Sequence, residues 1–228
     1  MRFPGPLVPA VFLSRPNRFL GIVFVEGEEA QCYIPNPGRM EELLYPGARV
    51  YLLERASETR KTSYNLVLVD KDGALVSIDS MVPNRVVSES IAAGLIREFR
   101  DLEVEKAEHT WGDSRLDFLL RGDAGQLLLE VKSCTLVREG VGLFPDAPTA
   151  RGSRHLQALA DGLEMGRAAV FFLIQRPDAE RMRPNEATDP EFAANLREVH
   201  LRGVEVYAYT SRVNLGGVFL GRGVQVQL

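Results

Sequence analysis

The spacing of hydrophobic and polar positions changes near residue 82, and this change divides the chain into two parts. In the first part, short apolar segments alternate with turn residues such as Glu26-Gly27 and Pro46-Gly47. Short segments rich in β-branched and aromatic residues, bounded by glycine and proline, are typical of strands. They cover residues 19–25, 30–34, 48–55, 63–69 and 75–78, with a single helical turn expected over 40–45. This pattern predicts a five-stranded barrel of the OB type over residues 1–82.

In the second part, residues 83–228, helical periodicity alternates with strand composition. Asn84 is expected to cap a helix that runs to about Phe99 and buries the side of Val87, Ile91 and Leu95. The segments that follow are a strand over 102–110, a hairpin over 114–121 and 126–137, a loop to 152, a helix over 153–165, a strand over 168–175, a helix over 189–202, and strands over 204–210 and 217–228. This order predicts an α/β domain, α+β for the chain as a whole, in which a mixed sheet has helices on both faces.

The hairpin holds the most informative residues of the chain. Residues 122–125 (GDAG) form a turn between two apolar segments, so the segments are expected to pair as antiparallel strands. If Arg121 faces Gln126, then Asp117 faces Glu130, and cross-strand partners have Cβ atoms about 5 Å apart. Lys132 lies two residues after Glu130 and should point the same way. The register therefore predicts two carboxylates and one lysine on a single face.

Two carboxylates this close repel each other unless a cation lies between them. Mg²⁺, or the similar Mn²⁺, suits one or two carboxylates completed by water and phosphate oxygens, and it can activate a water for phosphodiester cleavage. Lys132 would stabilise charge that develops on the phosphate. It is one of only 4 lysines beside 23 arginines. The alternative is an ordinary cross-strand ion pair, but the apolar runs 127–129 and 118–120 indicate a covered strand, where charges need a partner.

Other charged residues near this hairpin are candidates for the same site. Glu89 lies at the edge of the apolar side of the helix after 83, where it either leans into the sheet as a third carboxylate or stays solvated. Arg151 and Arg154 open the helix expected after residue 152, where positive charge opposes the helix dipole unless an anion binds. Alternatively, these arginines pair with Asp146 or Asp161. His109, His155 and His200 are scattered, and structural roles are expected for them.

Composition limits the classes of protein to which the chain can belong. A hydrophobic content of 45% and a charged content of 25% are those of a soluble globular protein, and no apolar stretch is long enough for a membrane helix or a signal peptide. We therefore expect a cytoplasmic protein with no membrane partner. Cys32 and Cys134 lack metal-ligand spacing and are expected to be buried. The net charge of −4 requires any nucleic-acid site to be local.

The first domain carries basic and aromatic side chains near its turns that suit nucleic acid, with Phe19, Tyr33 and Tyr64 available for base stacking. The candidate contacts are Arg15, Arg18, Arg39, Arg60, Lys61 and Tyr64, together with Arg151 and Arg154 of the second domain. The alternative is that these residues simply form the solvent-exposed surface of a small barrel and bind no ligand. No P-loop, nucleophile elbow, HExxH motif or dinucleotide fingerprint is present in the sequence.

Six sequence blocks resemble the sugar fermentation stimulation protein A family of bacteria and archaea. They are PNPGRM at 35–40, RKTSYNL at 60–66, PNRVV at 83–87, SRLDFLL at 114–120, EVKSCTL at 130–136 and FPDAPTARGSRHL at 144–156. The resemblance implies a DNA-binding protein with an OB-like domain followed by a domain similar to the PD-(D/E)xK nucleases. It also implies that Asp117 and Glu130 hold Mg²⁺ beside Lys132, with Glu89 matching a helix glutamate. Pro37 departs from the family pattern, in which a threonine is common.

Two hypotheses of function follow, both with DNA as the partner. In the first, the chain is a DNA-binding protein with a Mg²⁺-dependent nuclease site, in which the catalytic residues are Asp117, Glu130, Lys132 and Glu89. In the second, it is a non-catalytic DNA-binding regulator of sugar metabolism that retains the nuclease scaffold. An adaptor for RNA or protein is a third, more remote reading. The sequence leaves the oligomeric state open, a homodimer included.

Overall fold

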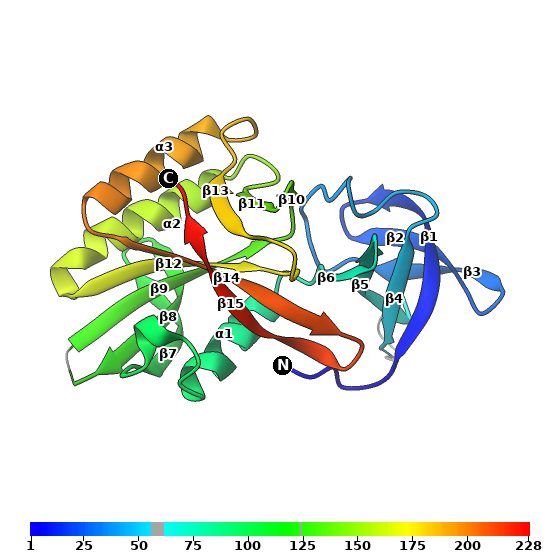
Figure 1. Cartoon of the computed structure of the whole chain (residues 1–228), viewed down its shortest axis with the longest axis horizontal. Helices are drawn as coiled ribbons and strands as arrows, with labels where there is room; N and C mark the ends of the chain where they lie inside the picture. The colour runs from blue at the N-terminus through cyan, green and yellow to red at the C-terminus, as the bar shows by residue number, and fades with distance from the viewer. Residues whose placement is uncertain (56–61, 124) are drawn as a thin grey trace.

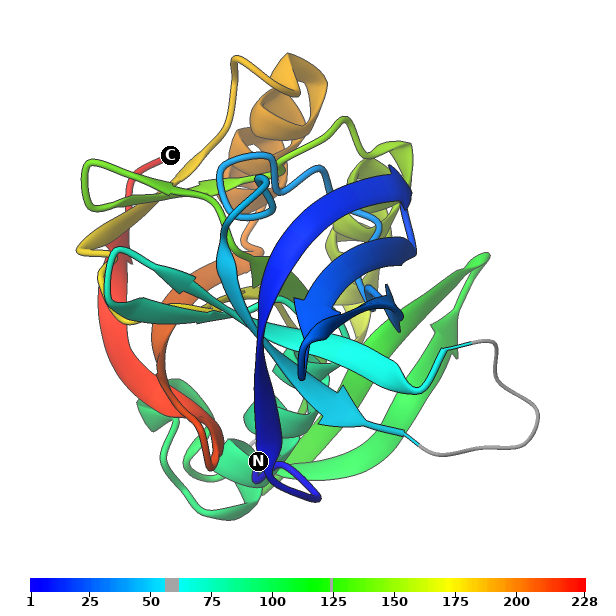
Figure 2. The same cartoon turned by 90° about the vertical axis from the view of Figure 1, so that its right-hand side faces the viewer.

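The first domain of the computed structural model, which describes residues 1–55, 62–123 and 125–228, is a closed five-stranded barrel (Figure 1). Its strands are β1 (Leu7–Asn17), β2 (Leu20–Val25), β3 (Glu28–Tyr33), β4 (Arg49–Glu54) and β5 (Tyr64–Lys71). They are ordered β3-β2-β1-β4-β5, and a short parallel pairing of β3 with β5 closes the ring. Figure 2 looks onto this barrel. The OB-type barrel predicted from the sequence is confirmed.

The first and the last of the five strands, in sequence order, differ from the sequence prediction. The last predicted strand is β6 (Ala74–Ser77), which pairs with β5 and lies outside the ring. The prediction missed β1, because prolines interrupt its apolar pattern. Pro9 pairs with Tyr51 of β4 in the half of β1 that lies beyond its pairing with β2, where a missing N–H is tolerated. The turn predicted over 40–45 is present, with the Leu44 N–H donating to the Met40 carbonyl over 2.8 Å.

The second domain is built on a nine-stranded mixed sheet in the order β10-β11-β13-β15-β14-β12-β9-β8-β7. The strands are β7 (Glu103–Trp111), β8 (Ser114–Gly122), β9 (Gly125–Cys134), β10 (Val137–Arg138), β11 (Val141–Phe144), β12 (Arg167–Ile174), β13 (Arg181–Pro184), β14 (Glu205–Asn214) and β15 (Gly217–Val226). The centre is parallel, because β12 runs parallel to both β9 and β14. Near-continuous apolar sequences in β9 and β12 match this covered position.

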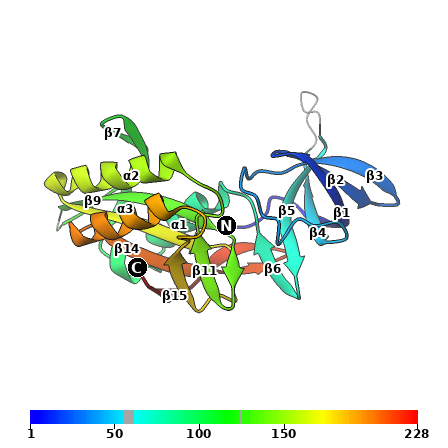
Figure 3. The same cartoon turned by 90° about the horizontal axis from the view of Figure 1, so that it is seen from above.

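Helices cover both faces of this sheet, as predicted (Figures 1 and 3). One face is covered by α1 (Val82–Ala92) and the short helix η1 (Arg97–Phe99), and the other by α2 (Ala150–Asp161), η2 (Gly162–Met165) and α3 (Pro190–Leu201). Two separate apolar cores result, one on each side of the sheet. Cys32 and Cys134 are free and buried, as expected. Among the described residues, no helix is long and apolar enough to cross a membrane.

Several boundaries in the second domain differ from the prediction, each for a local reason. The first helix begins at Val82 with Pro83 in its first turn, so Asn84 lies inside the helix and does not cap it. This helix ends at Ala92, and Gly94 adopts a positive φ of 63°. The predicted loop before residue 152 contains β10 and β11, and β13 was also missed. Strands of two to four residues are too short to show a period.

The two domains meet along the segment that joins β6 to α1. The Ser77 N–H donates to the Gln175 carbonyl over 2.9 Å, and the Ser80 N–H donates to the Pro35 carbonyl over 3.0 Å. The first residues of the chain cross to the second domain, where Arg2 forms a bridge with Gly217 of β15. These contacts hold the barrel beside the carboxyl end of β9 (Figure 1). Glu130 and Lys132, two of the predicted site residues, lie in this part of β9.

Candidate metal and nucleic-acid site

Glu130 and Lys132 form a buried ion pair on the α2 side of β9. The Lys132 Nζ lies 2.7 Å from the Glu130 Oε1, and the two residues are 9% and 4% exposed. They point to the same side because they are two residues apart on a strand, as predicted. The site therefore begins with a carboxylate and an ammonium group that are both largely removed from water.

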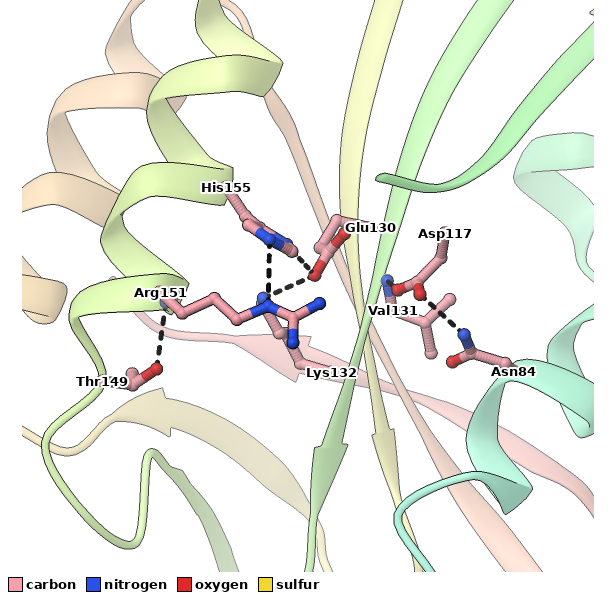
Figure 4. A network of polar contacts seen from close by, with 9 residues as sticks. Asn84, Asp117, Glu130, Val131, Lys132, Thr149, Arg151 and His155 are labelled. Atoms are coloured by element: carbon pink, nitrogen blue, oxygen red, sulfur yellow. Dashed lines mark hydrogen bonds and ion pairs between the residues drawn. The ribbon is translucent and has the colours of Figure 1, made fainter. Parts of the chain in front are cut away.

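His155 is the third partner of this pair, and sequence reasoning missed it. From α2, its Nδ1 contacts the Glu130 Oε1, while its Nε2 accepts a hydrogen bond of 3.2 Å from the Nε of Arg151 (Figure 4). Because a carboxylate oxygen can only accept, Nδ1 is the donor in the contact with Glu130. A polar residue four positions before Leu159, on the buried side of the helix, was the available signal.

Asp117 lies on the other side of β9, toward α1 (Figure 4). Its Oδ2 accepts a hydrogen bond of 2.8 Å from the Val131 N–H, and its Oδ1 accepts one of 2.7 Å from the Nδ2 of Asn84. The predicted register is confirmed from Phe118 opposite Leu129 to the turn, but the ladder ends there. The prediction that Asp117 faces Glu130 on one face is therefore wrong, because the Asp117 side chain takes the place of a backbone partner for Val131.

The two carboxylates still interact electrostatically. Burial, and then the charge of Glu130, raise the pKa of Asp117 to about 6. Burial also works against ionisation of Glu130, but hydrogen bonding from His155 and the charge of Lys132 outweigh it and lower the pKa of Glu130. One carboxylate is thus held ionised, and it makes ionisation of the second costly. A cation close to both would relieve this conflict.

The donor set is consistent with a hard divalent ion. The Glu130 Oε2 is buried and finds no hydrogen-bond partner among the described residues, so it is free to act as a ligand. Within the described part of the chain, no three or more acidic, histidine or cysteine side chains are grouped to hold a metal. An ion here would have two carboxylates and otherwise water or phosphate oxygens, a set typical of Mg²⁺.

Glu89 does not reach the carboxylates of β8 and β9. Its Oε2 lies 2.7 Å from the amino group of Met1, and its side chain is 60% exposed. It lines, with Asp117 and Asn84, a surface groove of about 390 Å³ between α1 and the hairpin. A ligand that enters this groove would contact both Glu89 and Asp117. The catalytic role of Glu89 stays a prediction.

Some of the predicted nucleic-acid residues gather in a cleft of about 560 Å³ between the two domains. Arg18 and Arg39 of the barrel line this cleft together with Lys132. Arg15 does not line it, since its guanidinium donates to the carbonyls of Asn36 and Gly38 over 2.9 and 2.8 Å and so supports the loop that carries Arg39.

The remaining candidates lie elsewhere. Tyr64 is half-buried at the start of β5. Arg151 contacts His155, and Arg154 lines a separate groove beside Trp111 and Asp161. Arg60 and Lys61 fall outside the described residues. The binding roles predicted for all these residues stay predictions.

The fold is that of a two-domain protein that joins an OB-type barrel to an endonuclease-like domain. Family models agree: residues 13–78 match the SfsA N-terminal OB domain, and residues 81–217 match the sugar fermentation stimulation protein RE domain. The chain belongs to the sugar fermentation stimulation protein family, the family that its sequence blocks resemble.

Known relatives match the chain over nearly its whole length. The sugar fermentation stimulation protein homolog of Moorella thermoacetica is 46% identical over 231 residues, covering 100% of each chain. The homolog of Desulforamulus reducens is 45% identical and covers 97% of this chain and 93% of its own. Among solved structures, Pyrococcus furiosus SfsA in complex with Ca²⁺ has a TM-score of 0.92 and 30% identity, covering 100% of this chain and 98% of that chain.

Proposed function

We propose that the chain is a DNA-binding protein with a Mg²⁺-dependent nuclease site formed by Asp117, Glu130 and Lys132. The observation that carries the proposal is the buried Glu130 Oε2, which has no partner among the described residues and belongs to a carboxylate that raises the pKa of Asp117. Two further findings support it: the match to an RE domain and the relative solved in complex with Ca²⁺.

Each residue of the site has a distinct part in the proposed reaction. Mg²⁺, when bound, would activate a water and reduce the negative charge of the scissile phosphate. Glu130 presents its free Oε2, while His155 and Lys132 hold the other oxygen. Asp117 is kept in place by Asn84 and Val131. Lys132 lines the cleft between the domains, from which it can stabilise charge on a phosphate bound there.

One observation favours the alternative, a DNA-binding regulator that does not cleave. Both oxygens of Asp117 and the Oε1 of Glu130 already have protein partners, so three of the four carboxylate oxygens are satisfied without a metal. A protein that only binds DNA could use this network as a structural support between α1, β9 and α2. The two functions differ in whether DNA is cut when a divalent ion is supplied.

Cleavage of plasmid and oligonucleotide DNA in Mg²⁺ or EDTA tests the proposal. We expect cleavage only with Mg²⁺, and a loss of about 100-fold or more in the Lys132→Met variant. Lys106→Met, which changes an exposed lysine on β7, is the matched control and should cleave like the wild type. DNA binding without cleavage would favour the regulator. Absence of DNA binding, or full activity of Lys132→Met, would overturn the proposal.

A further inference from the structure

Two aromatic rings lie exposed on the barrel next to the domain junction. The rings of Phe19 and Tyr33 are nearly parallel, with 17° between their planes and 6.1 Å between their centroids. They are 46% and 38% exposed. Phe19 directly precedes β2 and Tyr33 ends β3, and the Ile34 N–H donates to the Phe19 carbonyl over 2.9 Å, so paired backbone holds both residues. The pair forms a fixed apolar surface open to solvent.

These rings line a groove of about 300 Å³ that runs between the barrel and α1. Arg2, Arg55 and Arg85 line the same groove. Asp79 is the only acid among the described residues around it, and its Oδ1 accepts a hydrogen bond of 2.8 Å from the Met81 N–H. The groove therefore combines a stacking surface with positive charge.

The groove adjoins the cleft that contains Lys132. Pro37 and Ser80 line both hollows, so the two lie next to each other at these residues. Along the combined path, the described residues include six basic side chains and two acids. The basic residues are Arg2, Arg18, Arg39, Arg55, Arg85 and Lys132, and the acids are Asp79 and Asp146. In a chain with a net charge of −4, this path is a local concentration of positive charge.

Parallel rings and a line of arginines suit a polymer that offers both flat bases and phosphates. In a duplex the faces of the bases are already stacked on one another, so only unpaired bases can stack on protein side chains. The apolar ring of Pro37, which has no N–H, suits a base or sugar better than a phosphate at the junction.

We infer that this path binds a single-stranded segment of DNA, with bases stacked on Phe19 and Tyr33 and phosphates led by the arginines toward Lys132. The inference rests on the proposed function and narrows its substrate to unpaired DNA, such as a frayed end or a single-stranded branch. A duplex would then have to open before its phosphate could reach the site.

The test is binding of an oligothymidylate of about 15 nucleotides that carries the fluorescent base 2-aminopurine, in EDTA and at low ionic strength. Anisotropy of an end label reports affinity, and quenching of 2-aminopurine reports stacking. We expect the single strand to bind more tightly than a duplex of the same length. Phe19→Ala and Tyr33→Ala should each weaken binding at least about fivefold and reduce the quenching.

Phe24→Ala is the matched control, because Phe24 is also 46% exposed and lies on β2 but does not line the groove. It should bind like the wild type, and thermal unfolding checks that all three variants fold. Unchanged affinity and quenching in Phe19→Ala and Tyr33→Ala, or tighter binding of the duplex, would overturn the inference. The assay uses no divalent ion, so these results stand apart from the presence or absence of Mg²⁺-dependent cleavage.

Discussion

The Nδ2 of Asn84 donates a hydrogen bond of 2.7 Å to the Oδ1 of Asp117 and so ties the first turns of α1 to the hairpin. The other oxygen of Asp117 is held by the Val131 N–H at 2.8 Å. The carboxylate is therefore oriented from two sides, by a helix and by a strand. In metal sites, the residues that orient a ligating side chain contribute substantially to the affinity of the site for the metal.

Removal of the Asn84 amide should weaken metal binding without removing a ligand. We expect Asn84→Ala to lower the affinity for Ca²⁺ about tenfold, because Asp117 would be held by Val131 alone. Isothermal titration calorimetry measures this affinity. Ser88→Ala is the control, since Ser88 lies one turn further along α1 and lines the same groove. An affinity equal to that of the wild type would show that Asn84 does not orient a ligand.

Asp117→Asn should change how stability depends on pH. The folded protein raises the pKa of Asp117 to about 6 from an ordinary value of 3.8, chiefly through burial. Between these values the folded state binds more protons than the unfolded state, so this group destabilises the fold progressively as pH rises from about 4 to about 6. In EDTA, Asp117→Asn should gain stability relative to the wild type over this range, by at most about 3 kcal/mol.

Urea unfolding at several pH values, with and without Mg²⁺, measures this effect. The amide that replaces the Asp117 carboxylate has one acceptor fewer, but Asn84 can turn its own amide so that both hydrogen bonds are kept. Any remaining cost of the substitution should therefore be nearly constant with pH. Mg²⁺ should stabilise the wild type and not the variant. A difference between the two proteins that is the same at every pH would contradict the predicted cause.

His155→Ala should destabilise the protein by about 1–3 kcal/mol, since it leaves the buried Glu130 with one partner fewer. His155→Asn should recover part of this loss, because its amide nitrogen can replace Nδ1 as the donor. Guanidinium unfolding gives the stabilities, and Ca²⁺ titration should follow the same order. His109→Ala, on β7, should have a smaller effect. Equal stabilities of the Ala and Asn variants would exclude a role for this hydrogen bond.

The sequence predicted those elements whose conformation is determined by residues adjacent in the sequence. The hairpin register from Phe118 to the turn follows from composition and from the turn residues before Gln126. Strand β1 was missed because its prolines act as strand breakers only when both edges are paired, and pairing is a property of the whole barrel. Short strands such as β13 obtain their conformation from neighbours distant in sequence.

In the candidate site, too, some positions follow from local strand geometry and others depend on residues distant in the sequence. Glu130 and Lys132 share a face because strand geometry requires it. The position of Asp117 depends on where β8 leaves β9. Asn84, which lies 33 residues earlier in the sequence, also contributes to this position. His155 reaches Glu130 only because α2 packs on this face of the sheet. These contacts are tertiary, and no short window of sequence contains them.

The loop that carries Arg39 into the cleft depends on a glycine at position 38. A Cβ atom there would collide with the Oδ2 of Asp146, from the second domain, and would lie 3.0 Å from the Oδ1 of Asn36. The Asp146 carboxylate is buried against the N–H groups of Arg39 and Met40, so it has little room to move. The approach of the two domains at this point therefore requires the absence of a side chain.

Gly38→Ala should accordingly separate the barrel loop from the second domain. We expect a loss of about 1–3 kcal/mol in urea unfolding. Gly5→Ala is the control, because a Cβ at Gly5 meets only the Leu53 Cδ1, at 4.0 Å. Asp146→Ala removes the colliding oxygen, so the double variant Gly38→Ala/Asp146→Ala should lose less stability than the sum of the two single losses. Strict additivity would show that the two residues do not meet, and that the junction is held by other contacts.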